Sequence, residues 1–169
     1  MEVGEVFADA FGRVQEEVHA VLDGLSQEEL DTRPGPEANP IGWLVWHIAR
    51  VQDDHVAGVA GREQTWTADG WHERFALPLE PGEIGYGHTF EQVGQVSGIA
   101  ASELRAYYDA VHEATLAYVA TLSPEDLDRV VDTAWDPPVT LGVRLVSVVN
   151  DNQQHIGQAA YARGLLESS

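Results

Sequence analysis

Four long stretches of the sequence carry apolar residues at the spacing of an amphipathic α-helix, and no other feature limits the fold as strongly. They cover about residues 3–24, 40–60, 100–122 and 140–165. The apolar face of the first stretch is formed by Val3, Phe7, Ala10, Phe11, Val14, Val18, Val21 and Leu22. No run with the alternating pattern of a β-strand competes with these stretches. The pattern therefore predicts an all-α fold, a four-helix bundle.

Capping residues mark the ends of the predicted helices. Gly61 follows the second helix, as glycine commonly does at a helix C-terminus. Asn39 precedes Pro40, which predicts an N-cap followed by proline at the first helical position. Thr140 is the predicted N-cap of the last helix, which we expect to end near Gly164.

The segment between the second and third helices, residues 62–88, has neither a helical nor a strand period and ends in LPLEPGEIGYGH. Thr89 and Gln92 then have the spacing of a capping box. A connection of this length suits a crossover along the bundle better than a tight hairpin. We expect a long ordered loop that lines the mouth of a pocket.

The length and composition predict one domain, residues 1–169. A chain of 169 residues, 44% of them hydrophobic, can fill one core and is too short to require two. Two similar motifs, LSQEELD and LSPEDLD, follow the first and third helices. Each opens with the pattern of a capped helical turn, which suggests two helical pairs built on one plan.

Composition excludes several classes of protein. The chain has no cysteine, so any metal must be held by nitrogen and oxygen ligands. Its 28 acidic residues face nine basic ones, all arginine, and the net charge of −19 is the opposite of a nucleic-acid-binding surface. An acidic N-terminus and the absence of a long apolar run predict a cytoplasmic protein with no membrane partner. The apolar excess is compatible with a homodimer.

The last helix contains two residues with the spacing of metal ligands. Asp151 and His155 are four positions apart, which places them about 40° from one another and roughly 6 Å apart along the axis. The inward face is marked by Leu141, Leu145, Val148 and Ala159, with His155 predicted in its middle and Asp151 near its edge. A carboxylate that points at a core must be paired, hydrogen-bonded or metal-bound. By spacing alone, a metal-binding pair and a structural pair remain equal alternatives.

The second helix offers two histidines. His55 lies nearer the centre of the apolar stripe, whereas His47 lies at its flank beside Trp43. Periodicity alone therefore favours His55 as the inward histidine.

Two segments of the chain resemble the DinB/YfiT-like metalloprotein superfamily. The segment NPIGWLVWHIARVQDDHVAG resembles the second helix of that family, where a G-W-L-x-W-H or L-x-H-I core carries the first metal histidine, here His47. The segment PVTLGVRLVSVVNDNQQHIGQAAYARGLL resembles its last helix, in which His or Glu stands four residues before a second histidine; these positions are Asp151 and His155. The resemblance implies a DinB/YfiT-like four-helix bundle with a long crossover connection. It is closest to an uncharacterised, mainly actinobacterial branch and to the N-terminal domain of mycothiol-dependent maleylpyruvate isomerase.

The same resemblance implies one divalent metal, zinc or nickel before iron or manganese, held by His47, Asp151 and His155. Three protein ligands would leave positions open for water or substrate. Known members of the family are thiol-dependent transferases or isomerases. The implied function is a metal-dependent S-transferase or isomerase that uses a low-molecular-weight thiol such as mycothiol and an electrophilic substrate. The alternatives are a non-catalytic metal- or ligand-binding stress-response protein and a structural bundle whose metal site has decayed.

The remaining polar and aromatic residues are expected to have milder roles. Large aromatic side chains that would form the core or the floor of a pocket are Trp43, Trp46, Tyr108 and Trp135. Arg50 and Arg163 could each bind a substrate carboxylate or form a surface ion pair, and we expect surface ion pairs for both. The histidines with no partner at metal spacing, expected on the surface or in loops, are His19, His72, His88 and His112.

Overall fold

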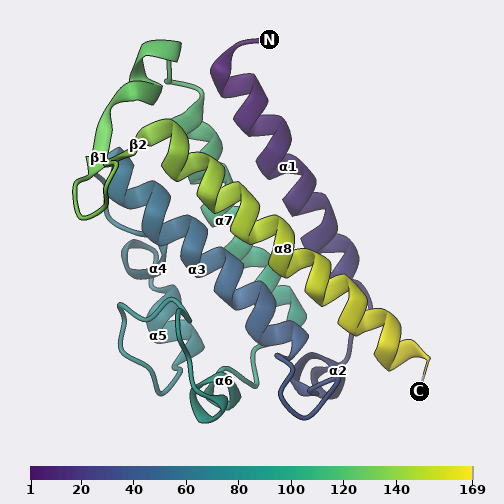
Figure 1. Cartoon of the computed structure of the whole chain (residues 1–169). Coiled ribbons are helices and arrows are strands. Elements are labelled where there is room, and N and C mark those ends of the chain that lie inside the picture. The colour runs from purple at the N-terminus through teal and green to yellow at the C-terminus, as the bar shows by residue number, and fades with distance from the viewer. Residues whose placement is uncertain (169) are drawn as a thin grey trace.

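Four long helices form the body of the protein (Figure 1). The computed structural model describes residues 1–168. The long helices are α1 (Val3–Leu22), α3 (Ile41–Ala60), α7 (Ala101–Val119) and α8 (Leu141–Glu167). The prediction of an all-α four-helix bundle is therefore confirmed.

The long helices are packed in a ring. Both α1 and α3 pack against α7 and against α8, so that α1 and α3 lie diagonally across the bundle. In Figure 1, α3 and α7 run in the same direction, which means that the chain between them must return along the length of the bundle. This return contains the short helices α4 (Thr65–Ala68), α5 (Trp71–Phe75) and α6 (Phe90–Gln95). It is the long crossover connection that the sequence predicted, although it includes short helices where a loop was expected.

Two other short segments follow the first and third long helices. They are α2 (Gln27–Asp31) and the 3₁₀-helix η1 (Pro124–Asp128), and each begins with a capping box, at Ser26 and at Ser123. A small hairpin that the sequence analysis missed, β1 (Val130–Asp132) with β2 (Val139–Thr140), then leads into α8. Strands of three and two residues are too short to show an alternating pattern.

Two helix ends differ from the prediction. Pro40, not Asn39, is the N-cap of α3, because its backbone is extended and its carbonyl accepts the amide of Leu44. Gly164 does not end α8, which continues to Glu167. Glycine inside a helix costs about 1 kcal/mol relative to alanine, which lowers stability but does not forbid the helical conformation.

The helix α3 is buried on all sides over its first thirteen residues, from Ile41 to Asp53. It contacts α7 and α8, and the crossover segment covers much of the rest of its surface. Gln52 joins the three long helices in the core: its amide donates to Thr115 of α7 and accepts from Tyr108 of α7 and Asn152 of α8. This polar network links the three helices and helps to fix their relative positions.

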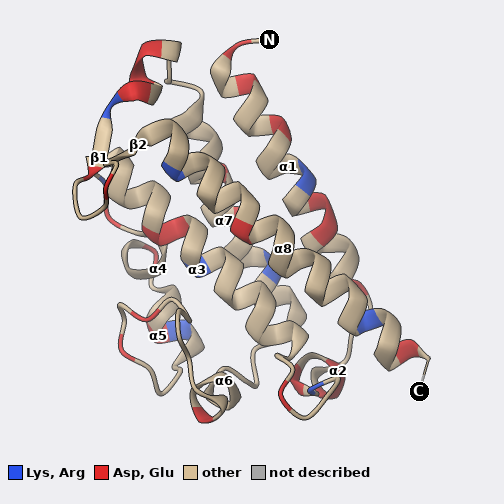
Figure 2. Cartoon of the chain, viewed as in Figure 1, with Lys and Arg blue, Asp and Glu red and all other residues tan. Residues whose placement is uncertain are grey.

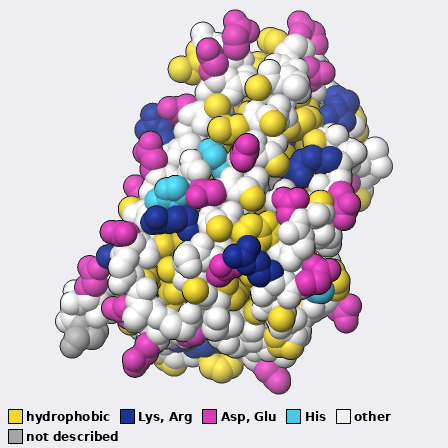
Figure 3. All heavy atoms as spheres, turned by 180° about the vertical axis from the view of Figure 1, so that it is seen from behind, with side chains coloured by type: hydrophobic (Ala, Val, Ile, Leu, Met, Phe, Trp, Pro, Cys, Tyr) yellow, Lys and Arg dark blue, Asp and Glu magenta, His cyan; other side chains and the backbone are white. Residues whose placement is uncertain are grey.

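Acidic side chains greatly outnumber basic ones, 28 to nine, and they are spread over the surface (Figure 2 and Figure 3). Figure 2 shows acidic segments on nearly every element, and the view from behind in Figure 3 shows acidic side chains scattered over the whole face. Within residues 1–168, no helix is both long and apolar enough to cross a lipid bilayer.

Candidate metal site

Histidine and carboxylate side chains from α3 and α8 meet near the middle of these two helices. His47 comes from α3, and Asp151 and His155 come from successive turns of α8. One ligand atom from each of the three lies within 4.8 Å of the others. His47 Nε2 is 3.9 Å from Asp151 Oδ2, and His155 Nε2 is 3.6 Å from Asp151 Oδ1. The three residues form a group that could hold a metal ion, and we call it the candidate metal site.

Each histidine of the candidate metal site is held by its other ring nitrogen. His47 Nδ1 lies 2.5 Å from the carbonyl oxygen of Ile84, and His155 Nδ1 lies 2.8 Å from Oε1 of Gln158. Because a backbone carbonyl oxygen can only accept, His47 Nδ1 carries the proton. In a neutral His47 ring the lone pair is therefore on Nε2, the nitrogen that faces Asp151, and His155 also turns its Nε2 toward Asp151. This is the second-layer hydrogen bonding that orients metal-binding histidines in proteins.

Burial sets the charge state of His47, whose side chain is 6% exposed. Burial lowers the pKa of His47, and the hydrogen bond to Ile84 and the charge of Asp151 offset this only in part. The neutral imidazole that results is the form that binds a cation. On Asp151, Oδ2 is buried and has no hydrogen-bond partner among the described residues. A buried carboxylate oxygen without a partner is costly, and a cation beside the two Nε2 atoms would satisfy it. The donor set thus fits a divalent metal.

The loop of residues 76–89 closes one side of the candidate metal site. Gly85 lies beside Nδ1 of His47 with φ +93°, and a Cβ atom there would come 2.5 Å from that nitrogen. The Trp43 ring stacks on His47 with 4.6 Å between ring centroids, and its indole N–H donates to Nδ1 of His88. His88, which was expected on the surface or in a loop, is a loop residue with a buried side chain. His88 is buried because of the path that the loop takes across α3. No pattern in the neighbouring sequence could have predicted this burial.

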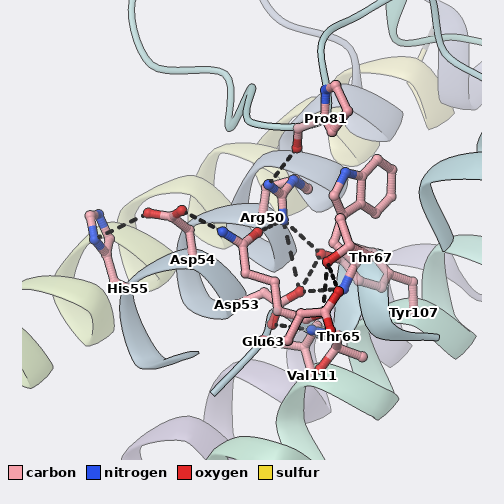
Figure 4. Close-up of polar contacts among 12 residues, drawn as sticks. Arg50, Asp53, Asp54, His55, Glu63, Thr65, Thr67, Pro81, Tyr107 and Val111 are labelled. Carbon is pink, nitrogen blue, oxygen red and sulfur yellow. Dashed lines mark hydrogen bonds and ion pairs between the residues drawn. The ribbon is translucent and has the colours of Figure 1, made fainter. Parts of the chain in front are cut away.

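Arg50 holds the same loop one turn further along α3. It is fully buried, and it donates to the carbonyl oxygen of Pro81 (Figure 4). It also donates to the carbonyl oxygen of Glu83 and to the side chains of Gln64 and Tyr107. The expectation of a surface ion pair for Arg50 was wrong, because the crossover segment folds over this side of α3.

Asp53 forms the acidic half of this buried network. Its oxygens accept the backbone N–H groups of Thr65 and Trp66, at 2.9 and 2.7 Å, and the hydroxyl of Tyr107 at 3.1 Å. Arg50 Nη1 lies 3.8 Å away. Asp53 therefore fixes the start of α4, while Arg50 fixes the loop of residues 76–89 (Figure 4).

The structure corrects the predicted position of the histidines relative to the core. His47 is buried and His55 is half-buried, the reverse of what periodicity favoured. The flank of α3 that carries His47 is covered by the 76–89 loop, which no analysis of a single helix can include. On α8, the centre of the buried face is Asn152, and Asp151 and His155 lie beside it, on the side that faces α3.

The other expectations have mixed outcomes. Among the aromatic residues, Trp43 contacts the candidate metal site, Tyr108 lies in the core, and Trp135 is 67% exposed. Arg163 does pair with Glu167 at the surface, and it also donates to carbonyl groups at the end of α1, among them that of Val21.

Comparisons with known proteins place the chain in a family. Residues 10–159 match the model of the DinB superfamily. A conserved protein from Enterococcus faecalis, known from a crystal structure, has the same fold with a TM-score of 0.93 and 32% sequence identity, over 100% of this chain and 99% of that one. No curated protein matches the sequence significantly. Since the family model covers most of the chain, the chain belongs to the DinB superfamily.

Proposed function

We propose that the protein binds one divalent metal, zinc or nickel, through His47, Asp151 and His155, and uses it in the transfer or isomerisation chemistry of a low-molecular-weight thiol. The observation that best supports a metal at this site is Oδ2 of Asp151, which has no hydrogen-bond partner among the described residues and lies beside the Nε2 atoms of the two oriented histidines. A bound divalent ion would stabilise a small thiol as its thiolate at neutral pH.

The three ligands differ in exposure, which indicates how a substrate approaches. The side chain of His47 is 6% exposed, whereas those of His155 and Asp151 are 23% and 34% exposed. Trp43 and the loop at Gly85 exclude water from the His47 side. A thiol would therefore reach the site from the α8 side, where Gln158 keeps the His155 ring in place.

Metal content tests the first half of the proposal. We expect near-stoichiometric metal in the purified protein after incubation with zinc or nickel, and loss of it in His155→Ala and Asp151→Ala. The matched control is His19→Ala, which removes a half-exposed histidine that pairs with Asp109 outside the site. A wild-type protein that takes up neither metal, or equal loss in the control variant, would contradict the site.

Thiol dependence tests the second half. The metal-loaded protein is assayed with mycothiol, bacillithiol and glutathione against a panel of electrophiles, with His155→Ala as the blank. Conjugation or isomerisation above the blank with one thiol supports the enzyme. Retained metal without turnover would favour the non-catalytic, ligand-binding alternative. The net charge of −19 supports the expectation that nucleic acid is not a partner.

A further inference from the structure

An open pocket lies between the C-terminal half of α3, β1 and the first turns of α8. Its volume is about 550 Å³. The charged and titratable side chains that line it are Asp54, His55, Arg62, Arg129 and Arg144. Three of the nine basic residues of a chain with net charge −19 thus surround one hollow, which we call the arginine pocket. Figure 2 shows basic segments beside η1 and near the start of α8, among acidic neighbours.

Two of these arginines retain binding capacity. Arg129 Nη2 donates to the carbonyl of Val59 and the hydroxyl of Tyr118, both neutral, and no carboxylate of residues 1–168 lies within ion-pair distance of it. Arg62 uses Nη1 for the carbonyl of Glu63 and the hydroxyl of Thr65, and its Nε and Nη2 have no hydrogen-bond partner among the described residues. These two atoms are buried, so the Arg62 side chain must turn toward the pocket to donate from them to an anion. Guanidinium N–H groups without acceptors favour an added anion.

The carboxylates near the arginine pocket are engaged elsewhere. Asp53, 3.8 Å from Arg62, already accepts two backbone N–H groups and a tyrosine hydroxyl and lies beside Arg50. Asp54 accepts the side-chain amide of Gln64 (Figure 4). Arg144 lies 2.8 Å from Asp132, which does not line the pocket, and Asp54 is the one carboxylate among the lining residues. The lining therefore has an excess of positive charge.

We propose that the arginine pocket binds the carboxylate or phosphate group of a small anionic molecule. Guanidinium groups present paired N–H donors that match both kinds of oxyanion. An anion between Arg62, Arg129 and Arg144 would also relieve the mutual repulsion of the three cations.

The arginine pocket lies in line with the candidate metal site. His55 follows His47 by eight residues, about 12 Å along α3, and Arg144 precedes Asp151 by seven, about 10 Å along α8. Seven residues are close to two full turns, so Arg144 and Asp151 lie on one face of α8. The anionic molecule is then the substrate or thiol of the metal site, with its reacting group about 10 Å from its anionic end. This last step rests on the proposed function, whereas the anion site itself does not.

Binding of defined probes tests the anion site. Isothermal titration calorimetry measures the binding of inorganic phosphate and of succinate, with succinamide as the neutral control. We expect one of the two anions to bind and succinamide not to bind. The anion that binds more tightly shows whether the natural ligand carries a phosphate or a carboxylate group. Arg129→Gln and Arg144→Gln should each weaken binding about tenfold. The matched control, Arg13→Gln, removes an exposed arginine paired with Asp9 on α1 and should leave affinity unchanged.

Two further measurements keep the outcomes distinct. Thermal unfolding followed by circular dichroism shows whether each variant folds. If one of Arg129→Gln and Arg144→Gln is unfolded, the other provides the test. The titrations are repeated on His155→Ala, where phosphate cannot bind through a metal at the candidate site. Anion binding that persists there supports the arginine pocket whatever the metal content. Absence of binding of both anions at millimolar concentration, or equal weakening by Arg13→Gln, would overturn the proposal and leave the metal site untouched.

Discussion

Replacement of Gly85 by alanine should weaken metal binding without touching a ligand. The new Cβ would lie 2.5 Å from Nδ1 of His47 and 3.0 Å from a ring carbon of Trp43. Both neighbours are held in the core, so the loop must move outward and the hydrogen bond from His47 to the carbonyl of Ile84 is lost. His47 then loses the contact that fixes its tautomer and ring orientation.

Two free-energy changes follow from this geometry. Strain of a non-glycine residue at φ +93° costs about 1–2 kcal/mol, and loss of the hydrogen bond costs about 1 kcal/mol. We therefore expect the free energy of unfolding of the metal-free protein to fall by about 2–3 kcal/mol in urea titrations. Loss of the partner that orients a metal histidine lowers metal affinity by about 10- to 100-fold, which competition with a chromophoric chelator can measure.

Gly87→Ala provides the matched control in the same loop. Its φ is +70°, and a Cβ there would meet nothing within 4 Å. This variant carries the backbone strain without the contact to His47, so it should lose about 1–2 kcal/mol of stability and keep wild-type metal affinity. Equal metal affinities of the Gly85 and Gly87 variants would refute the role of the loop in orienting His47.

Two predictions concern the stability of the metal-free fold. Asp53→Ala leaves Arg50 buried without its carboxylate and removes the acceptor for the start of α4. The free energy of unfolding, measured in urea titrations, should therefore fall by about 3–5 kcal/mol. A fall of less than about 1 kcal/mol would contradict the importance of the buried network. Burial lowers the pKa of His112, with Asp109 raising it and His19 lowering it. The unfolded chain therefore binds more protons as the pH falls through about 6.5, and stability present above that pH is lost below it. His112→Phe should lose less stability between about pH 8 and about pH 5.5 than the wild type does, and an identical pH dependence would show that His112 contributes nothing.

Much of the fold could be predicted from periodicity and capping. The four long helices appear where apolar residues repeat at helical spacing, and the capped turns begin at Ser26, Thr89 and Ser123 as predicted. Helices and their caps can be predicted in this way because a cap or an amphipathic stripe involves residues only a few positions apart in the sequence.

The candidate site was only partly predictable. The spacing of Asp151 and His155 on one helix is a local signal, but the choice of His47 over His55 depended on family resemblance. Periodicity favoured the other histidine because it assumes one buried face per helix, whereas α3 is buried on all sides from Ile41 to Asp53.

The sequence by itself determined the helical class, the approximate helix ends, and the excess of acidic charge. Only the tertiary structure decided which polar residues are buried. Arg50 and His88 have no local feature that distinguishes them from surface residues, and both are covered because the crossover segment returns across α3. The three arginines of the pocket are likewise far apart in the chain and converge only when α3, β1 and α8 pack together. Contacts between residues distant in sequence depend on how whole helices and loops pack, and a local pattern contains no record of that packing.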